Sequence, residues 1–176
     1  MDEQPLEIEV VRSSGRVKTA SARWIEPGKK VLVRLPVGLE ATEENRLIGQ
    51  LVGKVRAGSR RRDLNRAGKL AERAAELNRR YFGGKLVVQS IEWVTNQRGR
   101  YGSCTPETGA IRISDRVAEM PGWVQDYVLM HELAHLLEPN HGPDFWKLAN
   151  RYPLTERARG YLMAVGLEGM DGPTAE

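Results

Sequence analysis

The sequence predicts an α+β fold, in which helices pack on a mostly antiparallel sheet. Residues 6–36 and 85–114 contain short runs that alternate apolar with polar residues or are rich in β-branched residues. Residues 42–82 and those after 121 place apolar side chains at helical spacing. Because 176 residues fit one compact core, we expect a single domain over 1–168 and a disordered tail over 169–176.

The first 84 residues fall into two segments with different sequence patterns. Over 1–40, the runs LEIEVV, VKTASARWI and KKVLVRL are separated by turn signals, which predicts an antiparallel β-meander. Over 41–84 we expect a helical pair. The first helix covers about 42–57, a Gly-Ser-Arg-Arg-Arg stretch interrupts it, and the second ends at Gly83-Gly84.

The segment 85–168 begins with two predicted strands, KLVVQSIEWVT over 85–95 and AIRIS over 110–114, joined by a linker. A helix from 123 to 137 follows, and Pro139 cannot continue it. Gly142-Pro143-Asp144 opens a further helix, and residues 155–166 form the last one.

Charge is distributed unevenly along the chain. Residues 54–85 carry eleven basic and three acidic side chains, a net +8 within an overall charge of +4. Such a block can bind nucleic-acid phosphates, although a solvated helix face explains it more simply. No apolar run is long enough to cross a bilayer, the start MDEQPLEIEV does not resemble a secretory signal, and one cysteine cannot form an internal disulfide. We therefore expect a cytoplasmic monomer.

The segment HELAHLLEPNH contains all three histidines of the chain. His131 and His135 lie four residues apart, so one helix face can present both imidazoles to a metal ion. Pro139 ends the helix, which lets His141 return as a third ligand and leaves a position for water. Glu132 is rotated about 100° from His131, where its carboxylate can act as general base.

This set of residues predicts one zinc ion per chain and hydrolysis of peptide bonds by a zinc-bound water that Glu132 activates. Imidazole also binds iron, copper and nickel, so zinc is the preferred metal only. The simpler interpretation is an amphipathic helix whose histidines happen to face a cleft. Clustering of all three histidines within eleven residues favours metal binding.

Several neighbouring side chains are weaker candidates for the same site. Tyr101, Arg98 and Arg100 can stabilise an oxyanion if they border the cleft, and Cys104 can approach the metal as a thiolate. Packing or surface positions are the more common roles for such residues. Tyr127 and Asp144 can support a histidine, although core packing and helix capping explain them as well, and Phe145, Trp146 and Leu148 are expected in the core.

The stretches YGSCTPETGAIRIS and DYVLMHELAHLLEPNHGPDFW, within residues 98–152, resemble the YgjP-like metallopeptidases, zincins related to the SprT-like group. The resemblance implies a small zincin-like domain with residues 85–168 as its catalytic core, and supports His141 as third ligand. It also implies that the strand over 110–114 borders the cleft and pairs with an extended substrate. The family usually has Trp where Tyr101 stands, and Glu138 replaces the glycine of metzincins, so a metzincin is not expected.

We therefore expect a zinc metalloendopeptidase that acts on a polypeptide of unknown identity. The alternative is a nucleic-acid-associated protein whose basic segment 54–85 binds phosphates, with a metal site that is structural or acts on DNA-bound proteins. An inactive metal-binding scaffold is disfavoured by Glu132, because a structural site needs four closed ligands and no base.

Overall fold

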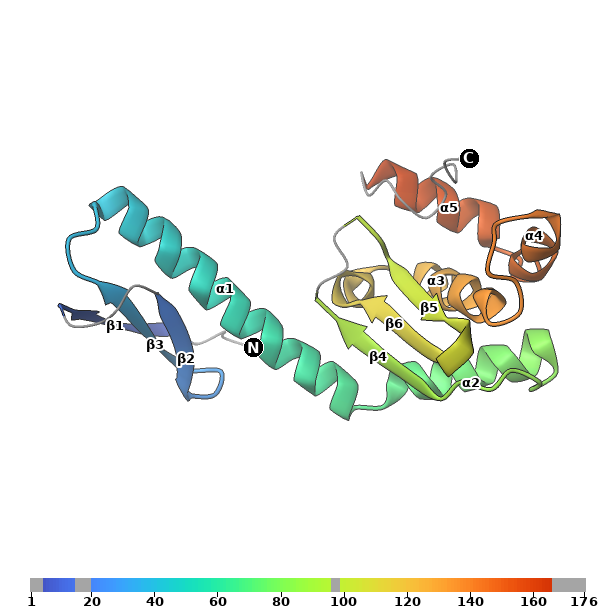
Figure 1. The fold of residues 1–176 in the computed structure, drawn as a ribbon, viewed down its shortest axis with the longest axis horizontal. Coiled ribbons are helices and arrows are strands. Elements are labelled where there is room, and N and C mark those ends of the chain that lie inside the picture. The colour runs from blue at the N-terminus through green and yellow to red at the C-terminus, as the bar shows by residue number, and fades with distance from the viewer. Residues whose placement is uncertain (1–4, 15–19, 96–98, 166–176) are drawn as a thin grey trace. The chain divides into compact units, whose positions relative to one another are not determined.

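The computed structural model describes residues 5–14, 20–95 and 99–165, so the predicted tail over 169–176 lies outside the described residues. The chain forms two compact units, Met1–Arg62 and Asp63–Glu176. Each contains a small three-stranded sheet and helical segments, which confirms the α+β class (Figure 1). The predicted single domain over 1–168 stays a prediction. In the described part of the chain, no helix has the length and apolar character needed to span a membrane.

The first unit has the strands β1 (Glu7–Ser13), β2 (Ser21–Glu26) and β3 (Lys30–Pro36) in the order β1-β3-β2. The predicted antiparallel meander is wrong, because β3 lies in the middle and pairs in parallel with β1 and antiparallel with β2. Burial explains the order. Val31, Val33 and Leu35 are fully buried and Leu32 is almost so, whereas β1 and β2 are largely exposed. The strand that is most apolar takes the central position.

Helix α1 (Ala41–Arg66) packs one apolar stripe against the amino-terminal sheet, including Leu51, Val52 and Val55. The predicted interruption over 58–62 is wrong, since the helix continues through it to Arg66. One glycine inside a helix costs only about 1 kcal/mol, which a 26-residue helix can absorb. The break comes at Gly68, whose φ of 69° a helix cannot accommodate. Helix α2 (Lys69–Phe82) follows and ends at Gly83, as predicted.

The second unit contains β4 (Ser90–Val94), β5 (Gly102–Thr105) and β6 (Ala110–Ser114) in the order β4-β6-β5. Since β6 pairs in parallel with β4 and antiparallel with β5, the sheet is mixed rather than mostly antiparallel. The strand predicted over 85–95 is shorter. The Asn78 side chain bonds both the amide and the carbonyl of Leu86, at 3.2 and 2.8 Å, and so occupies groups that a strand would offer. Strand β5 lies within the predicted linker.

Three helices complete the second unit: α3 (Gly122–His135), α4 (Pro143–Ala149) and α5 (Thr155–Ala164). Two short 3-10 turns, η1 (Pro106–Thr108) and η2 (Asp115–Glu119), lie on either side of β6. All three helices were predicted at nearly these bounds. Helix α3 lies in the core of the unit, against β5, β6 and the helices α2, α4 and α5.

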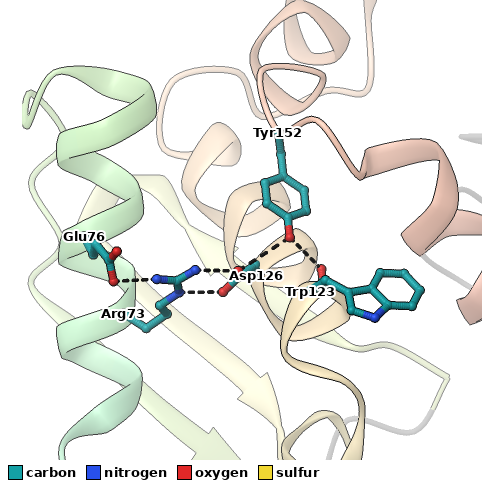
Figure 2. Close-up of polar contacts among 5 residues, drawn as sticks. All are labelled: Arg73, Glu76, Trp123, Asp126 and Tyr152. Carbon is teal, nitrogen blue, oxygen red and sulfur yellow. Dashed lines mark hydrogen bonds and ion pairs between the residues drawn. The ribbon is translucent and has the colours of Figure 1, made fainter.

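Polar contacts fix α3 to its neighbours (Figure 2). Arg73 of α2 donates two hydrogen bonds, each of 2.6 Å, to the two carboxylate oxygens of Asp126 on α3. The Tyr152 hydroxyl donates to the Trp123 carbonyl at 3.1 Å and lies 3.5 Å from the same carboxylate. A planar guanidinium fork limits rotation of a carboxylate more than a single bond does. These contacts set the direction of the helix that carries HELAH.

Candidate metal centre and active site

Three imidazoles meet at the carboxyl end of α3. His131 and His135 lie one turn apart on the helix, and His141 comes from the connection between α3 and α4. The Nε2 atom of His131 lies 3.1 Å from Nε2 of His135 and 3.0 Å from Nε2 of His141. The structure therefore brings together the three histidines that the sequence indicated, each through the same ring nitrogen.

The arrangement of the three nitrogens fits a bound cation. Two imidazole nitrogens on one tetrahedral zinc, each about 2.05 Å from it, lie about 3.3 Å apart, close to the separations observed. Nitrogen lone pairs at such a distance repel one another unless a proton or a metal ion lies between them. The three histidines are the group of potential ligands that the described residues bring within reach of one ion.

The environment favours the neutral form of His131 and His135, which is the form that binds metal. Burial, together with the neighbouring imidazoles of His135 and His141, holds the pKa of His131 well below its ordinary value. Burial also lowers the pKa of His135. The His135 Nδ1–H donates to the Glu138 carbonyl at 3.0 Å, which leaves the Nε2 lone pair for a ligand. Glu138 thus orients a ligand through its backbone, a role that a motif defined by side chains does not indicate.

Phe145 forms the apolar wall of the centre. Its ring centroid lies 4.8, 4.5 and 4.7 Å from those of His131, His135 and His141, and the side chain is fully buried. Trp146 stacks on His141, with centroids 6.0 Å apart and an interplanar angle of 28°. Both aromatic residues were expected in the core. Their additional role, holding the imidazoles, follows from α4 folding back on α3.

Glu132 follows the first histidine and points into the unit. Only 3% of the residue is exposed, and its Oε2 has no hydrogen-bond partner among the described residues. Burial raises the pKa of this carboxyl from its ordinary 4.5 to about 8, while the positive charge of Arg100 acts in the opposite direction. A buried carboxyl with a raised pKa, on the residue that follows a candidate metal ligand, is typical of a general base.

Among the weaker candidates near β5, Tyr101 and Cys104 lie in or against the core. Tyr101 is buried, and its hydroxyl donates to the Leu162 carbonyl at 3.2 Å, so it does not reach an oxyanion. Arg100 is exposed, and Arg98 lies outside the described residues. Burial raises the pKa of the Cys104 thiol to about 12, and this residue is not in the group of potential metal ligands that the described residues bring together.

The two weaker candidates on helices, Tyr127 of α3 and Asp144 of α4, differ in burial and in contacts. Tyr127 is fully buried and stands edge-on to His131, with ring centroids 6.1 Å apart, so it supports this ring by packing. Asp144 is exposed and forms an ion pair with Lys147 at 2.7 Å, so the described contacts give it no histidine to orient. A role for Asp144 in supporting a ligand stays a prediction.

The strand that borders the site is β5, not the one inferred from the resemblance. Strand β6, over 110–114, has β4 on one side and β5 on the other, so both of its edges are already paired. It cannot add a substrate strand. Among the described strands, β5 is the outer one on the side of α3, and its first residue, Gly102, lies against Glu132.

The fold and the histidine cluster define a metallopeptidase, and comparison with known proteins agrees. A family model described as "YgjP-like, metallopeptidase domain" matches residues 69–163. The chain belongs to this family, whose model matches more than half of it, and is a hydrolase of peptide bonds. This confirms the resemblance inferred from the sequence.

One solved structure is similar in fold: the crystal structure of the metallopeptidase zymogen of Pyrococcus abyssi abylysin, at a TM-score of 0.50 and 17% sequence identity. The match covers 58% of this chain and 99% of that chain. At this identity the likeness concerns the fold alone. The search of curated proteins gave no match.

Proposed function

We propose that the protein is a zinc-dependent endopeptidase in which His131, His135 and His141 hold one zinc ion and Glu132 is the general base. The observation that supports this most is the convergence of three Nε2 atoms, together with an unpartnered buried oxygen, among the described residues, on Glu132, the residue that follows His131 in α3. Three protein ligands leave a tetrahedral ion one position for water or substrate, which a catalytic site requires.

Zinc in such a site supplies Lewis-acid chemistry, acidifying water and polarising the scissile carbonyl. The protein supplies the proton transfers. Glu132 accepts a proton from the attacking water and delivers it to the leaving amine nitrogen, so the carboxylate is regenerated when the peptide bond is broken. The high pKa of the buried carboxyl favours its holding this proton between the two steps. A cation nearby favours the carboxylate form that begins the cycle.

The proposed substrate is an extended polypeptide that pairs with the outer edge of β5. Main-chain pairing at a sheet edge binds peptides with little dependence on their sequence. Since β5 has four residues, the pairing is short and demands a segment that is already unfolded. Folded proteins are therefore poor substrates, and the assay should use unfolded chains or peptides.

Elemental analysis of the purified protein, with cleavage of a mixed peptide library, tests the proposal. We expect about one zinc per chain. His135→Ala and His141→Ala should lose both metal and cleavage, and zinc should restore activity to chelator-treated wild-type protein. Lys147→Ala, on the exposed side of α4, is the matched control and should keep both. A wild-type protein that neither contains nor takes up metal would refute the proposal.

A role with nucleic acid is the second candidate, and the course of α1 favours it. The helix is continuous to Arg66, and it exposes Arg60, Arg62 and Arg66 on regular backbone. Phosphates bind to such cations with a strong dependence on salt. If this candidate holds, charge reversal at these positions should weaken DNA binding and reduce its salt dependence. Binding that is weak and indifferent to both would remove it.

The remaining expectations belong with this proposal: a monomer in the cytoplasm. The single cysteine, Cys104, supports a reducing compartment because the chain has no second thiol for an internal disulfide.

A further inference from the structure

Gly102 faces the candidate base at a distance that only glycine permits. A Cβ atom built on Gly102 would lie 2.4 Å from Oε1 of Glu132 and 2.8 Å from both its Cδ and its Cγ. Real Cβ atoms essentially never approach another heavy atom within 3.0 Å. The φ of Gly102 lies outside the left-handed range, so the backbone conformation does not require glycine. The requirement comes from the lack of space for a side chain next to Glu132.

Glu132 has little room to move away. The residue is 3% exposed, its Oε2 is buried, and the next residue of α3, Leu133, is fully buried. In a closely packed interior, an added methyl group moves its neighbours or strains them. A Cβ at position 102 would therefore displace the carboxylate or push β5 away from α3. Either change alters where the carboxylate lies relative to the Nε2 atoms of the histidines.

We propose that Gly102 is a positioning residue for Glu132: the bare backbone at the start of β5 forms the seat that fixes the position of this carboxylate, on the helix that carries His131 and His135. The steric relation between the two residues stands by itself. Its consequence for catalysis rests on the proposed function, in which Glu132 is the base.

The seat also explains the sequence of β5. The side chains of a strand alternate between its two faces, so Gly102 and Cys104 share the face toward α3. The larger and neutral Cys104 packs on the core, while the position opposite the carboxylate has no side chain at all. A strand that begins with glycine is weak in isolation. The space that glycine leaves for the Glu132 side chain offsets this loss of strand stability.

The first experiment compares Gly102→Ala with wild type in metal content and steady-state cleavage. We expect the metal to be retained, KM to change little, and kcat to fall at least tenfold, because a displacement of about 1 Å in a reacting group can cost a hundredfold. Gly160→Ala is the matched control, since no described atom lies within 4 Å of its Cβ position outside the backbone of its own helix. It should keep kcat. Loss of metal from Gly102→Ala, or an unchanged kcat, would overturn the proposal.

The second experiment does not depend on any enzymatic activity. Glu132→Ala removes all three atoms that a Cβ at position 102 would meet. We expect Gly102→Ala to lower the melting temperature of the full chain by about 2–10 °C in the wild-type background, and by much less in Glu132→Ala. The double variant should fold even if the single one does not. An equal loss in both backgrounds would overturn the proposal.

The two experiments separate this inference from the proposed function. If wild-type protein cleaves no peptide, the proposed function fails, and the melting temperatures still decide the steric relation between Gly102 and Glu132. If wild type cleaves and the two melting-temperature losses are equal, the proposed function stands and the inference fails.

Discussion

Helices α1 and α3 show how differently one chain uses the same secondary structure. Of the 26 described residues of α1, only Val52 is buried, whereas nine of the 14 residues of α3 are buried. Helix α1 packs a partly buried apolar stripe on the sheet and leaves most of its charged residues exposed. Helix α3 is enclosed on several sides, and His131 and Glu132 are among the residues it buries.

The difference in burial between the two helices indicates which part of the protein can carry reactive groups. A substitution of a polar group at the exposed surface changes the stability of a protein little. A polar group in the core has a shifted pKa, and its position is fixed by the packing around it. The pKa shifts of His131 and Glu132 have burial as their first cause, so the reactivity of the site depends on the enclosure of α3.

The largest effect should come from the buried charge of Glu132 in metal-free protein. The folded-state pKa is raised to about 8 from an ordinary 4.5, so the stability that comes from protonation is fully present below about pH 4.5. It is lost as pH rises through about 8. Glu132→Gln does not titrate, so it should become more stable than wild type over this range, by up to about 5 kcal/mol.

Denaturant unfolding of both chelator-treated proteins from pH 5 to pH 9 measures this difference. The histidines are the same in the two chains, so their titration contributes equally to both. Added metal serves as control, because a cation beside the carboxylate should reduce the difference. Parallel stability curves would mean that Glu132 is hydrated rather than buried.

The next effect concerns apolar packing in the same two helices. Leu133→Ala in α3 removes a fully buried side chain and should lower the free energy of unfolding by about 3 kcal/mol. Leu47→Ala in α1 removes a partly buried one and should cost about 1 kcal/mol. Hydrogen exchange of each helix, followed together with denaturant unfolding, assigns the loss to its unit. Similar losses of unfolding free energy at the two positions would contradict the difference in burial between α1 and α3.

The smallest expected effect is a difference in coupling energy between two ion pairs. Arg73 and Asp126, which join α2 to α3, should show a coupling of about 1 kcal/mol in a double-mutant cycle, since the Arg73 side chain is 40% exposed and solvent screens it. The surface pair, Arg12 and Glu44, joins β1 to α1. The Arg12 side chain is 54% exposed and that of Glu44 16%, so we expect a smaller coupling than for the first pair. Arg73→Gln, Asp126→Asn and the double variant provide the first cycle. A larger coupling for the surface pair would contradict this account of burial.

The elements that the sequence predicted well are those fixed by local rules. His131, Glu132 and His135 share one helix, so their relation follows from helix geometry alone, and Pro139 marks where the chain turns toward His141. The end of α2 at Gly83 is equally local. Such features need no knowledge of what the segment packs against.

The elements that the sequence did not predict depend on partners distant in the chain. Strand β5, with the sequence Gly-Ser-Cys-Thr, has no apolar alternation, and it forms because β6 offers it an edge. The central place of β3 follows from its burial rather than from its order along the chain. The approach of Gly102 to Glu132 needs both the strand and the helix in place, so neither motif alone could indicate it.

Glu132→Gln provides the most direct test of the central claim, that a buried carboxylate beside three histidines acts as the base. The substitution keeps size and shape while it removes the capacity to accept the proton. We expect the variant to retain about one zinc per chain, as wild type does, and to cleave the peptide library at least a thousandfold more slowly. Cleavage at the wild-type rate with zinc bound would contradict the account.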